Sequence, residues 1–278
     1  MKILVTTDFS INSKAAIQYA ANFSKQMKGA ELIFYSTVEM MQPAAWNLSF
    51  FKKYATEEKI RLTKDLEKFV KSTIGPNKTA LIGCKYVIEF TQGTEKAIIE
   101  YAAKSKCQFI CIATNGAGVL RKLMGTHTSY LVNHSTVPVM AIPSKYKTKA
   151  IKKITYVSDF ENLSTELNKV AKLNDLLKSQ TEALHYARMG ANHPQTIKKS
   201  KIFAKPAFSG IKANILETNI EYSLVERLTK YIGKQHPDLI ILFTRQKKGF
   251  FEQLFLPSKA AELTFSTKIP TLIYPKKK

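Results

Sequence analysis

Arginine is scarce in this chain of 278 residues, although the chain is strongly basic. Lysine and arginine together number 43 against 21 aspartates and glutamates, a net charge of +22, yet only five of the 43 are arginines. Positive charge attracts nucleic acids and other anions, but bidentate contacts with bases and phosphates favour arginine over lysine. The lysines are also spread along the chain rather than clustered, apart from the last three residues. The composition therefore disfavours specific nucleic-acid binding and indicates a solvated basic surface.

Cysteines and long apolar runs are also few. Cys84, Cys107 and Cys111 are the only cysteines, and no further metal ligands lie near them in the sequence. Free thiols in a reducing compartment are the simplest interpretation. No apolar run approaches the roughly 20 residues that span a bilayer, and the first residues do not resemble a signal peptide. We therefore expect a cytoplasmic protein with no metal site of its own and no membrane partner.

Short apolar runs alternate with amphipathic stretches through the first half of the chain. Strands are predicted at residues 2–6, 31–38, 84–90, 108–113 and 137–142. Helices are predicted to begin near Ser10, Thr56, Gly93 and Thr128, with a loop over residues 40–51. Strands that alternate with helices of this length indicate a parallel, doubly wound α/β sheet.

The same pattern restarts near residue 151. Residues 152–160 repeat the first strand at an offset of 151 residues, which also places Tyr35 on Tyr186. Residues 237–244 and 269–275 repeat residues 107–114 and 137–143 in the same way. Proline occurs in both final strands, which favours edge strands, and two such edges can pair with each other. The sequence therefore predicts two copies of one fold, at residues 1–145 and 151–276.

Glycines and hydroxyls gather between a predicted strand and a helix start at residues 113–128. Gly116, Gly118 and Gly125 allow backbone N–H groups to face a ligand, and the following helix N-terminus favours anions. Both a phosphate cradle and a plain flexible loop are consistent with this pattern. No dinucleotide fingerprint or P-loop is present, and no nucleophile, base and acid stand together. We therefore expect no enzymatic activity.

Asp8 follows the first predicted strand, and ligands of doubly wound sheets bind outside the carboxyl ends of strands. Its carboxylate has two interpretations, a ligand contact and a cap for the turn that follows. Taken with the late glycine-rich loop, the Gly125–Thr128 segment and the Val-Pro-Val strand at residue 137, the chain resembles the universal stress protein (UspA-like) family over nearly its whole length. The resemblance implies two tandem five-stranded parallel domains of the Rossmann-like, adenine nucleotide alpha hydrolase-like type, paired through their last strands. In one subset of the family it also implies binding of ATP with magnesium.

The resemblance assigns roles to particular residues. Ala113 stands where the ATP-binding subset has a glycine, and the loop from Gly116 to Gly125 is one residue shorter than in that subset. Any ATP hydrolysis would be slow and incidental. The nucleotide-binding residues implied are Thr7 and Asp8 on the nucleoside side, Thr37 and Val38 at the adenine wall, and Ala113, Gly116, Gly118, Gly125, Thr126, His127 and Thr128 around the phosphates.

The second copy departs further from this pattern. Within residues 244–258 only Gly249 remains, and Pro257 replaces the glycine at the helix start, which removes a backbone donor. We therefore expect an adenine nucleotide in the first copy alone. Two alternatives stay open: a scaffold of the same fold that acts through protein partners, and a basic nucleic-acid-associated protein. Whether the intrachain pair associates further into a homodimer is also open.

Overall fold

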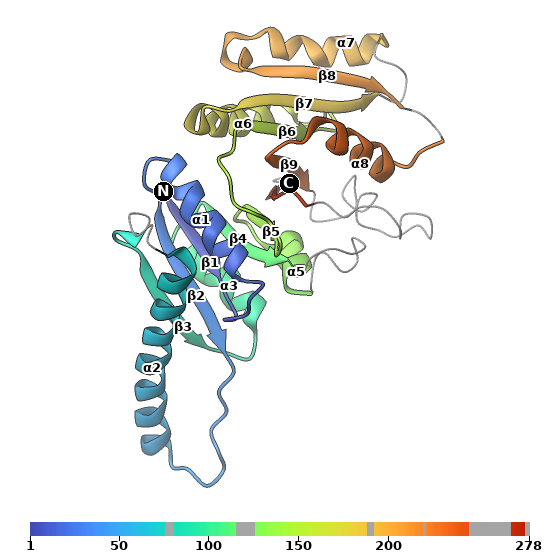
Figure 1. Ribbon diagram of the computed structural model, residues 1–278. Coiled ribbons are helices and arrows are strands. Elements are labelled where there is room, and N and C mark those ends of the chain that lie inside the picture. Colours follow the sequence, from blue (N-terminus) through green and yellow to red (C-terminus); the bar gives the residue numbers. More distant parts are fainter. Residues whose placement is uncertain (76–80, 115–125, 188–191, 219–220, 245–267, 276–278) are drawn as a thin grey trace.

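The computed structural model describes residues 1–75, 81–114, 126–187, 192–218, 221–244 and 268–275 (Figure 1). Its N-terminal half contains β1 (Lys2–Thr6), α1 (Lys14–Gln26), β2 (Glu31–Val38), α2 (Leu48–Ile74), β3 (Lys85–Phe90), α3 (Thr94–Lys104), β4 (Phe109–Thr114), α5 (Thr126–His134) and β5 (Val139–Pro143). Its C-terminal half contains β6 (Lys153–Val157), α6 (Leu163–Leu177), β7 (Gln180–Ala187), α7 (Pro194–Ser200), the 3₁₀ turns η2 (Lys201–Ala204) and η3 (Pro206–Phe208), β8 (Ile211–Glu217), α8 (Leu224–Gln235), β9 (Leu239–Thr244) and β10 (Thr271–Pro275).

The described strands form one ten-stranded sheet in the order β3-β2-β1-β4-β5-β10-β9-β6-β7-β8. Neighbouring strands are parallel within each half. The halves meet where β5 and β10 pair antiparallel, with Met140 opposite Leu272. The predicted fold class, including the pairing through the last strands, is therefore confirmed. The boundaries at residues 145 and 151 stay a prediction.

Helices cover both faces of the sheet, and each face has its own apolar core. One core packs α1, α2 and α6 against the strands, and the other packs α3, α5 and α8. Aromatic packing crosses the junction of the halves, because the ring centroids of Phe109 in β4 and Tyr274 in β10 lie 6.4 Å apart. Among the described helices none is long and apolar enough to cross a membrane.

Side chains from both halves hold the segment that links them. The Gln26 side-chain amide donates to the carbonyls of Ile151 at 2.6 Å and Leu177 at 3.2 Å, and its oxygen accepts the Ile151 N–H at 3.0 Å. Each of these bonds satisfies a main-chain group that would otherwise be costly to bury. The start of β6 is therefore tied to α1 as well as to the sheet.

Asp238 holds the same junction from the other side of β6. Its carboxylate accepts the backbone N–H groups of Lys152 and Lys153, both at 2.9 Å, and pairs with Lys149. Burial raises the pKa of this carboxyl, but the hydrogen bonds from Lys149 and the two N–H groups outweigh burial and hold the pKa below its usual value.

Two predicted helix starts are wrong. α1 begins at Lys14, and Ser10 instead closes the preceding turn by accepting the Ser13 N–H at 3.2 Å. α2 begins at Leu48, inside the predicted loop, because the Asn47 side chain caps it by accepting the Phe50 N–H at 2.8 Å. No residue of α2 before Leu66 is buried, and the first turns project away from the sheet (Figure 1). Apolar periodicity predicts only the part of such a helix that packs on the sheet, because the projecting part has no buried face.

The repeat offset also needs correction in the second strand of each half. Thr6 pairs with Tyr35, and its counterpart Val157 pairs with Leu184. The counterpart of Tyr35 is therefore Leu184 and not Tyr186, because the connection through α6 is two residues shorter than that through α1. In the corrected register Tyr186 stands in the place of Thr37.

Candidate functional site

The carboxyl ends of three neighbouring strands meet at one edge of the N-terminal half. β1 pairs with β2 on one side and with β4 on the other, and α1 and α3 lie in the cores of opposite faces. Such a switch point opens a crevice in which doubly wound folds bind ligands. The structure thus brings together five sequence-predicted residues from the ends of these strands: Thr7, Asp8, Thr37, Val38 and Ala113.

These side chains differ in their exposure to solvent. Asp8 is exposed, and Thr37, Val38 and Ala113 are partly exposed. Tyr35, two residues before Thr37 on β2, is fully buried. Thr7 is buried as well, so only the other four of the five residues are open to a ligand.

The turn after β1 is held by its own side chains. Asp8 Oδ1 accepts the Ser10 N–H at 3.0 Å, and the hydroxyls of Thr7 and Ser13 lie 2.7 Å apart. Phe9 follows with a φ of 61°, and its N–H donates to Thr7 Oγ1 at 3.1 Å. Asp8 therefore caps the turn, as one interpretation predicted. The ligand contact stays a prediction for this exposed side chain.

The same turn determines the charge of Asp8. Partial burial raises the pKa of the carboxyl, but hydrogen bonds from the side chain and backbone of Ser10, with smaller contributions from Asp8 N–H and Ser13, outweigh it. The pKa of Asp8 therefore lies below its usual value. The site thus presents an ionised acceptor at neutral pH.

The end of β2 is tied to α3. The hydroxyls of Thr37 and Thr94 lie 3.0 Å apart, and the Val38 carbonyl accepts the Thr91 N–H at 3.1 Å. These bonds fix the position of Thr37 and Val38 at the carboxyl end of β2. The two residues can form a wall, as the resemblance implies.

The start of α5 supplies the last described part of the site. Thr128 is buried, and His127 Nδ1 lies 2.9 Å from Glu95 Oε1 on α3. The pKa of the Glu95 carboxyl is lowered, first by its own backbone N–H and then by His127. The sequence analysis missed Glu95, since nothing in its spacing relates α3 to α5. His127 therefore links two helices at the rim of the site.

Part of the predicted site lies outside the described residues. This holds for Gly116, Gly118 and Gly125 and for the side chain of Thr126. Within the described ranges, no group of three or more His, Cys, Asp or Glu side chains could hold a metal ion.

The C-terminal half has the same turn after its first strand, but larger side chains lie beside that turn. Asp159 Oδ1 accepts the Glu161 N–H at 2.9 Å, and Phe160 has a φ of 59°. However, the His185 ring stacks on Phe160 with centroids 3.8 Å apart, and burial lowers the pKa of His185. Tyr186 occupies the Thr37 position, and its hydroxyl donates to the Arg227 carbonyl at 3.0 Å. Large side chains thus stand where the first half has a short one.

Comparisons with known proteins agree with this architecture. The model of the universal stress protein family matches residues 1–143. The chain is similar in structure to a universal stress protein from Archaeoglobus fulgidus, with a TM-score of 0.69 and 14% identity, covering 99% of this chain and 98% of that one. It is also similar to a protein of unknown function from Pseudomonas aeruginosa, with a TM-score of 0.56, 11% identity, and coverage of 99% and 92%. At these identities the likeness shows the fold alone. No curated protein matches the chain significantly.

Proposed function

Because the chain belongs to the universal stress protein family, we propose that its N-terminal half binds an adenine nucleotide, ATP with magnesium, and acts as a nucleotide-dependent sensor. The C-terminal half then serves as a structural partner in the same sheet. The proposal concerns binding rather than turnover. His127, the histidine at the site, already pairs with Glu95.

One observation carries this proposal: the ends of β1, β2 and β4 place partly exposed and exposed residues around one switch point. The ionised Asp8 is suited to accept hydrogen bonds from ribose hydroxyls or from base N–H groups. Val38 and Thr37 are suited to contact a planar base. The N-terminal turn of α5 is suited to anionic phosphates through its backbone N–H groups.

The test uses two aspartates that cap equivalent turns. Asp8→Ala and Asp159→Ala each remove an equivalent turn hydrogen bond of about 3 Å, so Asp159→Ala is the control for loss of the cap. We expect Asp8→Ala to weaken ATP–magnesium binding by about tenfold or more, the effect of losing a hydrogen bond to a charged group. Asp159→Ala should not weaken it. Calorimetry on the full chain measures both. Equal losses in both variants, or no binding at millimolar ATP, would contradict the proposal.

A second candidate function is a scaffold that acts through protein contacts. The projecting start of α2 favours it, because Leu48 and Phe50 are 57% and 53% exposed. Trp46 packs edge-on against Phe50 and Tyr54, with centroids 4.8 and 5.0 Å away. Exposed aromatic clusters often mark contact surfaces. If ATP binding fails in calorimetry while the wild-type chain self-associates or binds a protein through this helix, the scaffold function replaces the nucleotide function.

A further inference from the structure

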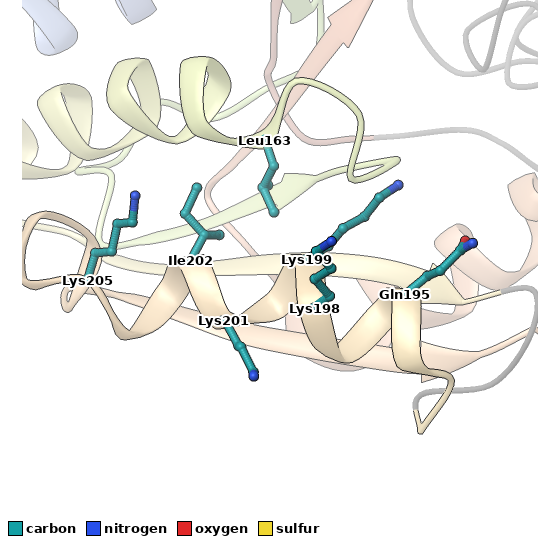
Figure 2. Close-up of a pocket in the computed structure, with 7 residues that line it drawn as sticks. All are labelled: Leu163, Gln195, Lys198, Lys199, Lys201, Ile202 and Lys205. Carbon is teal, nitrogen blue, oxygen red and sulfur yellow. The ribbon is translucent and has the colours of Figure 1, made fainter.

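A groove in the C-terminal half lies between the start of α6 and the segment formed by α7 and η2 (Figure 2). Its volume is about 610 Å³, within the range of roughly 300–1,000 Å³ found for small-molecule sites. Leu163 from α6 and Ile202 from η2 face each other across it (Figure 2). The groove belongs to the crossover between β7 and β8 and is far in sequence from the candidate site of the N-terminal half.

Four lysines line this groove: Lys198, Lys199, Lys201 and Lys205. All four lie within residues 198–205, so this segment is an exception to the even spread of lysines along the chain. Residues 194–216 contain no aspartate or glutamate. None of the four lysines forms an ion pair with a carboxylate in the described part of the chain. Like charges held together without counter-charges repel one another, so an anion that enters the groove relieves this repulsion.

The side chains combine charge with an apolar floor. Ile202 of η2 and Lys205, the residue after η2, reach toward α6 and Leu163, whereas Lys201 points the opposite way (Figure 2). Ile202 is half-buried and packs against the apolar core of this face. Burial is the main cause of the lowered pKa of His185 in β7, and the positive charge of Lys199 lowers it further. Lys199 therefore lies near the end of β7. A ligand here would meet ammonium groups at the rim and aliphatic side chains beneath them.

We propose that this groove binds a small molecule carrying two or more phosphate groups. Lysine binds phosphate as a point charge, and several lysines together suit a ligand with several phosphates. No arginine is among the described residues that line the groove, and this composition and the small volume favour such a ligand over nucleic acid. The groove is separate from the crevice of Asp8, so this proposal does not depend on the proposed nucleotide site.

The test measures binding of tripolyphosphate to the full chain by calorimetry at fixed ionic strength. We expect saturable binding that weakens by about tenfold or more in Lys199→Gln/Lys205→Gln, as expected for the loss of charge-assisted hydrogen bonds. The control is Lys64→Gln/Lys68→Gln on α2, two exposed lysines whose loss changes the net charge equally. This control should bind as the wild type does.

Each other outcome has a defined meaning. Equal weakening in both double variants, or no saturable binding, would overturn the groove proposal in favour of a nonspecific charge effect. Competition by random duplex DNA at a fraction of the tripolyphosphate concentration would overturn it in favour of a nucleic-acid surface. Asp8→Ala separates the two sites, since it should weaken ATP binding through the nucleoside and leave tripolyphosphate binding in the groove unchanged.

Discussion

The two halves share their strand order and differ most in the connection from the second to the third strand. In the N-terminal half α2 has 27 residues, and Arg61 pairs with Glu58 and Asp65 along its surface. In the C-terminal half α7 has 7 residues, and residues 194–216 carry only positive charge. The two halves therefore have the same sheet, but this connection gives them surfaces that differ in helix length and in charge.

The turn after the first strand, in contrast, is nearly the same in both halves. Phe9 and Phe160 both have positive φ, and Asp8 and Asp159 both cap their turns. What differs is the neighbouring strand end, where Tyr186 replaces the short side chain of Thr37. A preserved turn is thus no evidence of a preserved site, since the space beside it decides what can bind.

The largest expected effect on the free energy of unfolding distinguishes the packed part of α2 from its projecting part. Leu66 is 0% exposed, so Leu66→Ala should lower the free energy of unfolding by about 2–5 kcal/mol, as for other buried leucines. Ile60 is 54% exposed, and Ile60→Ala should change it by no more than about 0.5 kcal/mol. Urea unfolding followed by circular dichroism measures both. A loss at Ile60 as large as that at Leu66 would show that the projecting turns are packed in solution.

Two buried tyrosines, one in each half, differ in whether their hydroxyl groups have hydrogen-bond partners. The Tyr156 hydroxyl bonds Glu166 and Ser158, and Tyr156→Phe should cost about 1–3 kcal/mol because it removes the donor to a buried carboxylate. The Tyr19 hydroxyl of the N-terminal half has no partner among the described residues. Tyr19→Phe should therefore be neutral or stabilising. Matched urea titrations compare them, and equal losses would contradict the assignment of the Tyr156 network.

The junction of the halves should respond to acid through Asp238. Its pKa is lower when folded, so it contributes stability above the unfolded aspartate pKa of about 3.9, which is lost as pH falls through the folded pKa. Asp238→Asn should lower the thermal midpoint at pH 7, and the difference from wild type should shrink below about pH 4. A constant difference from pH 7 to 3 would show that the Asp238 charge does not hold the junction.

The smallest expected effect compares two helix caps. Ser223 and Glu226 form a reciprocal capping box at α8, and Ser223→Ala should cost about 1 kcal/mol. Asn47 caps the projecting end of α2, so Asn47→Ala should fray that end and leave the global unfolding midpoint nearly unchanged. Hydrogen exchange should show faster exchange at residues 48–52 alone. A global loss equal to that of Ser223→Ala would contradict this view of α2.

Sequence patterns predicted the sheet well because buried strands leave continuous apolar runs and the repeat reveals their order. They predicted the start of α2 poorly, since residues 48–61 carry no buried face for periodicity to detect. The repeat offset failed at Tyr186 because the loops around α6 are shorter than those around α1, although α6 has 15 residues and α1 has 13. Such a change in loop length leaves no mark on either strand. The His127–Glu95 pair depends on tertiary packing between α3 and α5, which no spacing in the sequence encodes. The groove lysines lie together within residues 198–205 of the sequence, but the groove itself depends on the packing of this segment against Leu163.

The most direct test locates the adenine ring itself. Photolabelling of the full chain with 8-azido-ATP, followed by peptide mass spectrometry, identifies the half that contacts the base regardless of where phosphates bind. The proposed function predicts labelled peptides from residues 1–143, near the ends of β1 and β2, and loss of label in Asp8→Ala but not in Asp159→Ala. Label confined to residues 151–275, or shared equally between the halves, would contradict it.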